Sequence, residues 1–115
     1  MGFLRKIEIT AMSNLIASDT GVKGAVIWVS AGEFSGKESA HGARIKVMLG
    51  NKITSEGLDD AATVTLTVEP KVIGKLPAKI KKDVITFVTL NRKTLISYWN
   101  NKISTRELLN TLIKI

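Results

Sequence analysis

Four short stretches of the first seventy residues have the sequence pattern of strands: in three of them hydrophobic and polar residues alternate with a period of two, and residues 25–30 form a β-branched and aromatic run. These stretches are residues 4–11, 25–30, 44–49 and 63–69, and Gly, Ser, Asn and Asp bound them. A period of two puts alternate side chains on opposite faces of a strand, and one apolar face beside one polar face is typical of antiparallel sheets. We therefore expect four strands, joined in part by exposed loops at residues 31–43 and 50–62.

The pattern changes to that of a helix after Pro70. From Pro77 onwards, one face roughly 120° wide is apolar, and it holds Ile80, Val84, Phe87, Val88, Leu95, Tyr98 and Trp99. The β-branched run at residues 84–88 and the position of Asn91 on this apolar face are unfavourable for a helix, so the sequence leaves open whether the helix continues through Asn91 or breaks or kinks there. The sequence Ser-Thr-Arg-Glu at residues 104–107 fits a capping box and predicts a short second helix.

These elements predict a single α+β domain over residues 1–115, with a sheet-forming part at 1–70 and a basic helical part at 71–115. The expected architecture is a four-stranded, mainly antiparallel sheet followed by one long and one short helix packed on one face. A length of 115 residues suits one core. No apolar run approaches the ~18 residues of a membrane span and no signal-peptide pattern is present, so we expect neither a membrane partner nor secretion.

Charge divides the chain into two unequal parts. Residues 1–70 carry seven basic and eight acidic residues, whereas residues 71–115 carry ten basic and two acidic residues. Lys79, Lys82 and Lys93 fall on the outer face of the predicted long helix, with Arg92 at its flank. Such a row can neutralise successive phosphates, so these four residues are candidate contacts for nucleic acid or another acidic partner. The alternative is an ordinary solvated helix face.

The sequence offers little enzyme chemistry. It contains no Cys, and His41 is its only His, which removes thiolate sites and metal sites built on His pairs. The loop at residues 32–39 has three residues between its glycines where a Walker A loop has four, and Glu38 stands where that loop has a hydroxyl. We therefore expect no enzyme activity, cofactor or metal. A small enzyme that uses His41 with a loop carboxylate is the alternative.

Three stretches carry a resemblance to known proteins. Residues 41–47, 84–100 and 104–109 resemble a family of short bacterial and phage-borne proteins of unknown function, which share an H-x-x-R-I-K-V stretch and a helix ending in an aromatic residue followed by Trp-Asn. The matching polar or aromatic positions are His41, Arg44, Asn91, Trp99 and Asn100. The resemblance implies a cytoplasmic protein of a bacterium or mobile element, and it assigns none of these positions a role. We interpret Asn91 first as a buried amide that needs hydrogen-bond partners, and only second as part of a site.

Together these observations predict a non-enzymatic protein-interaction or binding module. A protein partner or self-association is expected, because small domains with exposed sheet faces or edges often associate. The alternative function is salt-dependent nucleic-acid binding through the basic helix face.

Overall fold

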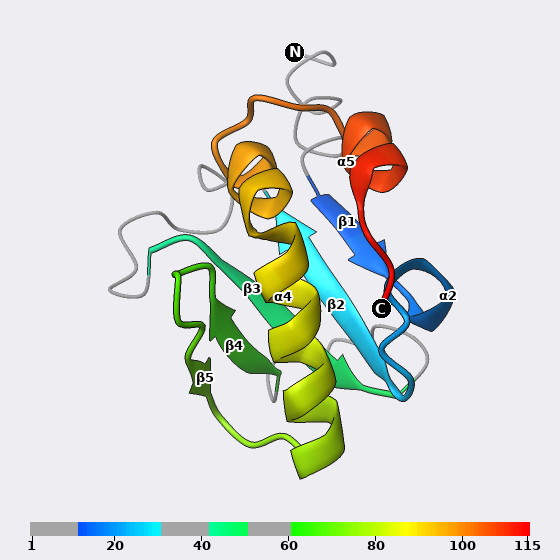
Figure 1. Ribbon diagram of the computed structural model, residues 1–115, viewed down its shortest axis with the longest axis vertical. Helices are drawn as coiled ribbons and strands as arrows, with labels where there is room; N and C mark the ends of the chain where they lie inside the picture. The colour runs from blue at the N-terminus through cyan, green and yellow to red at the C-terminus, as the bar shows by residue number, and fades with distance from the viewer. Residues whose placement is uncertain (1–11, 31–41, 51–60) are drawn as a thin grey trace, which may run out of the picture.

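The computed structural model describes residues 12–30, 42–50 and 61–115. These residues form an α+β fold in which an antiparallel sheet is covered on one face by helices (Figure 1). The elements in chain order are β1 (Met12–Leu15), α2 (Ala17–Thr20), β2 (Ala25–Ser30), β3 (Arg44–Leu49), β4 (Ala62–Thr65), β5 (Val72–Ile73), α4 (Ala78–Trp99) and α5 (Thr105–Thr111). The five strands lie in the order β1-β2-β3-β4-β5, and each neighbouring pair is antiparallel.

The predicted strands at residues 25–30 and 44–49 are confirmed, whereas the predicted number of strands is wrong. The sheet of the described residues has five strands, and two of them, β1 and β5, are not among the predicted ones. β5 has two residues and is too short for alternation to reveal. β4 ends at Thr65, four residues before the predicted end. There the Thr65 hydroxyl accepts a hydrogen bond from the Lys71 amide at 2.8 Å, which turns the chain back into β5. The strand predicted at residues 4–11 lies outside the described residues.

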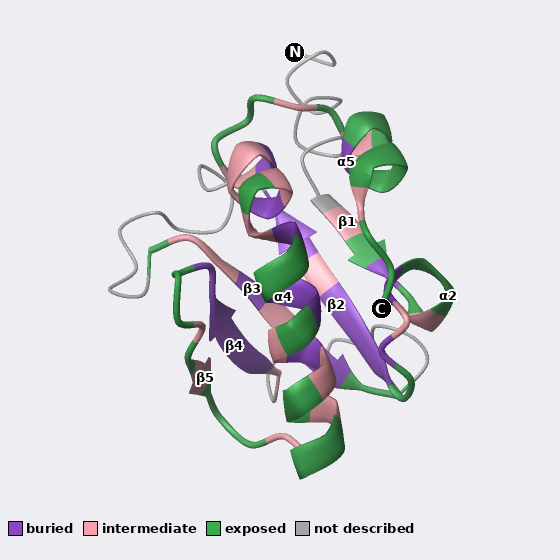
Figure 2. Ribbon diagram, viewed as in Figure 1, coloured by how far each residue is buried: buried purple, intermediate pink, exposed green. Residues whose placement is uncertain are grey.

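The core lies between the sheet and α4. The strand register sets Ile27 opposite Val47 and Ile45 opposite Val64, and these side chains pack with the buried face of α4. Figure 2 shows exposed residues along the side of α4 that is turned away from the sheet. The opposite face of the sheet is not simply a solvated polar surface, because the cross-strand neighbours Val26 and Met48 are also buried there.

α4 runs without a break through all 22 residues from Ala78 to Trp99, which answers the question that the sequence left open at Asn91. Val84 and Val88 are fully buried against the core. The intrinsic helix preference of such residues costs at most ~0.7 kcal/mol each, whereas burying each side chain gains about 1.5–3 kcal/mol. The Asn91 side chain donates a hydrogen bond to the Phe87 carbonyl one turn earlier at 2.9 Å, so this amide supports the helix.

α5 begins at the predicted capping box. The Glu107 amide donates to the Ser104 hydroxyl at 3.1 Å, and the Ser104 amide donates to the Glu107 carboxylate at 3.2 Å. Leu108 is fully buried and fixes α5 to the core. In the part of the chain that the structure describes, no helix is long and apolar enough to span a membrane.

Candidate functional site

Three of the basic side chains of α4 lie on the outward face that the sequence pattern predicts. Lys79, Lys82 and Lys93 are exposed on the outward face of the helix. Thr86 and Thr89 lie between them, and their hydroxyls donate back to the Lys82 and Ile85 carbonyls. With a rise of 1.5 Å per residue, the row from Lys79 to Lys93 extends about 21 Å along the helix axis. We call these three lysines the basic row.

Arg92 does not belong to the basic row. Its Nε donates a hydrogen bond to the Leu66 carbonyl at 3.2 Å, just beyond the end of β4. The side chain is only half-exposed, and this contact ties α4 to the sheet. The prediction grouped Arg92 with the lysines because both lie on the polar side of the helix, whereas the structure directs Arg92 towards the protein.

Lys79 has one acidic neighbour, and this neighbour holds it only weakly. Its Nζ lies 3.3 Å from Asp83 Oδ2, one turn along the helix, and the Lys79 side chain is 82% exposed. Exposed ion pairs of this kind contribute about 0–1 kcal/mol and are screened by salt. An approaching anion therefore competes with Asp83 at little cost.

The start of α4 is an unfavourable place for positive charge. Its first turn contains Lys79 and no acidic residue, and Pro77 at the N-cap supplies no side-chain hydrogen bond. Lys81 and Lys82, two and three residues after Lys79, are also exposed. Because the helix dipole is positive at this end, each cation lowers helix stability here by up to about 1 kcal/mol. The helix dipole therefore does not favour positive charge at this end of α4.

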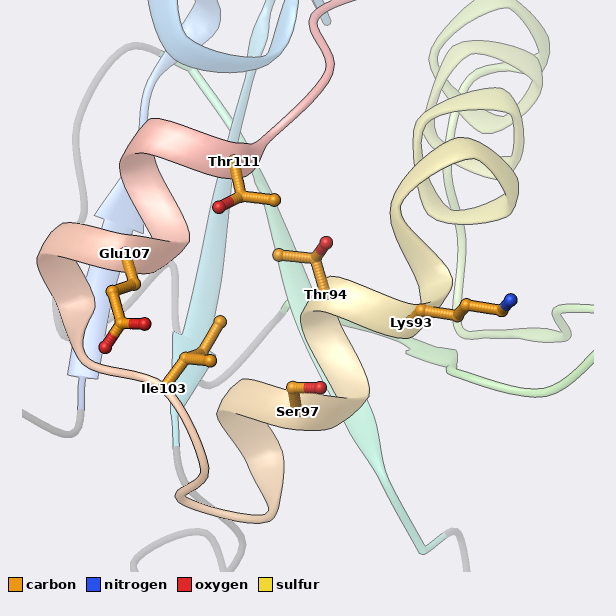
Figure 3. A pocket seen from close by; sticks show the side chains of 6 residues that line it. All are labelled: Lys93, Thr94, Ser97, Ile103, Glu107 and Thr111. Atoms are coloured by element: carbon orange, nitrogen blue, oxygen red, sulfur yellow. The ribbon is translucent and has the colours of Figure 1, made fainter.

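A shallow groove of about 230 Å³ separates α4 from α5 (Figure 3). Its lining residues are Lys93, Thr94, Ser97, Ile103, Glu107 and Thr111. Lys93 extends away from α5 in Figure 3, and the Glu107 carboxylate is already engaged with the Ser104 amide. Over the described residues, no group of three His, Cys, Asp or Glu side chains could hold a metal ion.

Of the residues that match the family pattern and lie in the described part of the chain, Arg44, Trp99 and Asn100 lie near one another and Asn91 lies apart. His41 lies outside the described residues. The Arg44 guanidinium lies 5.2 Å from the centroid of the Trp99 ring, a cation–π contact that joins the start of β3 to the end of α4. Asn100 follows α4 as its C-cap, and its amide donates to the Ile96 carbonyl at 2.9 Å. Asn91 lies elsewhere, in the middle of the helix.

Lys46 on β3 is a half-buried cation near Arg44. Its Nζ donates to the Thr63 hydroxyl on β4 at 2.6 Å. Burial lowers the pKa of Lys46 below 10.5, and the charge of Arg44 lowers this pKa further. The alternation predicted that Lys46 points away from Ile45 and Val47, but only the sheet register shows Thr63 as its partner.

Asn91 is confirmed as a buried amide with partners, since only 2% of its surface is exposed. Its Nδ2 donates to the Ile113 carbonyl at 2.8 Å, and its Oδ1 accepts from the Ile113 amide at 2.7 Å. The Ile115 amide donates to the Thr20 carbonyl at 2.9 Å. Sequence reasoning missed Thr20, Ile113 and Ile115, because these contacts use backbone groups, which leave no signal in the sequence. We call residues 112–115 the strap.

Comparisons with known proteins complete the description of the site. No protein-family model, curated protein sequence or solved structure matches this chain. The family resemblance therefore stays a prediction, and a proposal of function rests on the geometry and charge of the described residues.

Proposed function

We propose that the protein is a non-enzymatic binding module whose basic row contacts a polyanionic partner, and that this partner is nucleic acid. One observation carries the proposal. Three exposed lysines form a row on the outward face of a helix, in a part of the chain with ten basic and two acidic residues. The position of Lys79 and its neighbours at the positive end of the helix dipole supports the same conclusion.

The packing of α4 makes this row a defined surface. Because Val84, Phe87, Val88 and Leu95 fix the inner side of α4 to the core, the lysines project from a rigid support. Lysine ammonium groups neutralise phosphates and release the counterions condensed on them, which requires no base contact and reads no sequence. Nucleic acid is abundant in the bacterial cytoplasm, the compartment that the family resemblance implies.

The salt dependence of binding follows from the number of phosphates neutralised. If each lysine neutralises one phosphate of duplex DNA, log K falls with log salt at a slope of about −2.7. Affinity then decreases about 40-fold between 50 and 200 mM salt. This is a modest, non-specific affinity, as expected for a surface that recognises charge alone.

Titration of fluorescein-labelled, mixed-sequence DNA and RNA over this salt range, followed by fluorescence anisotropy, tests the proposal. The triple variant Lys79→Glu, Lys82→Glu, Lys93→Glu is expected to lose binding. The matched control Lys71→Glu, Lys102→Glu, Lys114→Glu makes the same change in net charge at exposed positions outside the basic row. This control is expected to keep most of the binding. Absence of binding at 50 mM salt, or equal loss in both variants, would refute the proposal.

A further inference from the structure

The strap crosses from the end of α5 to α2 (Figure 1). It starts in an extended conformation, with φ −57° and ψ 136° at Leu112. The side chains of Ile113 and Ile115 remain 52% and 38% exposed. Leu112 packs against the core, and beyond it the strap is held by hydrogen bonds of its own backbone, to Asn91 through Ile113 and to Thr20 through Ile115.

The Asn91 amide acts as the peptide group of a neighbouring strand would. It donates to the carbonyl and accepts from the amide of the same residue, Ile113, at 2.8 and 2.7 Å, as paired residues do in an antiparallel sheet. A buried amide that lacks partners costs about 1–3 kcal/mol, and Asn is also an unfavourable residue inside a helix. An extended peptide satisfies this side chain.

At the far end of the strap, the contact surface belongs to α2, whose own hydrogen bonds do not involve the strap. Thr20 is fully buried, and its hydroxyl accepts a hydrogen bond from the Val22 amide at 3.0 Å. Gly21 follows with φ +83°, and its amide donates to the Ala17 carbonyl at 2.7 Å. A side chain at Gly21 would overlap the Ile115 carbonyl. The small residue therefore lets a second backbone approach closely, while the Thr20 carbonyl accepts its amide.

We propose that Asn91, Thr20 and Gly21 form a recognition site for an extended peptide, which the strap occupies in this structure and which an extended segment of a protein partner takes in its place. The site forms hydrogen bonds with the amide and the carbonyl of one peptide residue and with the amide of the residue two positions later. It requires few side chains, and the partly buried Leu112 indicates a preference for an apolar residue at that position. This inference is independent of the basic row, because different residues carry it.

Release of the strap in the full-length chain tests the proposal. Ile113→Pro removes the amide that donates to Asn91 Oδ1 and leaves the rest of the chain intact. The probe is a fluorescein-labelled, end-blocked peptide with the sequence of residues 110–115, titrated by fluorescence anisotropy. We expect it to bind Ile113→Pro at least tenfold more tightly than the unmodified chain, where the tethered strap competes at an effective concentration of the order of mM. Adding Asn91→Leu to Ile113→Pro is expected to abolish binding. Equal binding to all three proteins, or none to Ile113→Pro, would overturn the proposal.

Hydrogen exchange on the unmodified chain gives a second test that needs no variant. If the strap leaves its site while the domain stays folded, the amides of Ile113 and Ile115 exchange by local opening. We expect them to exchange at least 100-fold faster than the core amides of Val47 and Val88. Exchange of all four amides at one common rate would mean that the strap opens only on global unfolding, and the site would then never be free for a partner.

Discussion

Replacement of Asn91 by Leu tests how much the buried amide contributes to stability. Leu has the same number and branching of side-chain heavy atoms as Asn, with methyl groups in place of the amide oxygen and nitrogen, so the change removes hydrogen bonds without leaving a cavity. Three hydrogen bonds are lost, one to Phe87 and two to Ile113. The substitution therefore removes the polar groups of this position while an apolar side chain keeps the space filled.

The expected magnitude follows from what each partner loses. The Phe87 carbonyl lies inside α4 and keeps its helical hydrogen bond, so its loss is small. The amide and carbonyl of Ile113 lose their protein partner, at about 1 kcal/mol each. We expect the free energy of unfolding to fall by about 2 kcal/mol, which lowers Tm by roughly 6–12 °C for a domain of this size.

Urea unfolding followed by circular dichroism measures this difference, with the m-value showing that unfolding remains two-state. The matched control is Asn110→Leu, at an exposed position of α5, which is expected to change stability by less than about 0.5 kcal/mol. A loss below about 0.5 kcal/mol for Asn91→Leu would show that the hydrogen bonds between Asn91 and the strap add nothing to stability, and would refute the stabilising role of this amide.

Two further predictions concern the capping box and the half-buried lysine. Ser104→Ala removes the hydroxyl that accepts from the Glu107 amide and is expected to cost about 1 kcal/mol in urea unfolding; an unchanged midpoint would contradict a capping role. Because burial and Arg44 lower the pKa of Lys46 from 10.5, the folded chain releases this proton at a lower pH than the unfolded chain. Lys46 therefore makes the free energy of unfolding rise with pH between its folded and unfolded pKa values. Arg44→Ala is expected to raise the pKa of Lys46 towards 10.5, as measured by NMR titration of its side chain, and an unchanged pKa would rule out the influence of Arg44.

The candidate binding surface was predictable only in part. The periodicity placed Lys79, Lys82 and Lys93 on one exposed face, because helical periodicity depends on spacing alone. It also assigned Arg92 to that surface, where the structure shows a contact with a carbonyl 26 residues earlier in the chain. A long side chain near the edge of a helix face can bond to a group on a neighbouring element. The spacing of residues within the helix does not show which group that is.

The sequence by itself determined the elements whose signals are local. The strands at residues 25–30 and 44–49, the amphipathic face of α4 and the capping box at Ser104 each depend on residues within one element, which chain geometry relates directly. These signals were sufficient for an antiparallel sheet followed by two helices, because alternation and helical periodicity determine which side chains can be buried together.

Only the tertiary structure decided the number of strands, the continuity of α4 and the contacts of the strap. β5 has two residues and is held as a strand by pairing with β4. Asn91 remains helical because its amide is satisfied by Ile113, 22 residues further along the chain. The physical reason is the same in each case. The stabilising contacts form only after distant parts of the chain come together, and they involve the buried face of α4 and the backbone groups of β5 and the strap. These contacts outweigh the conformational preferences of the individual residues.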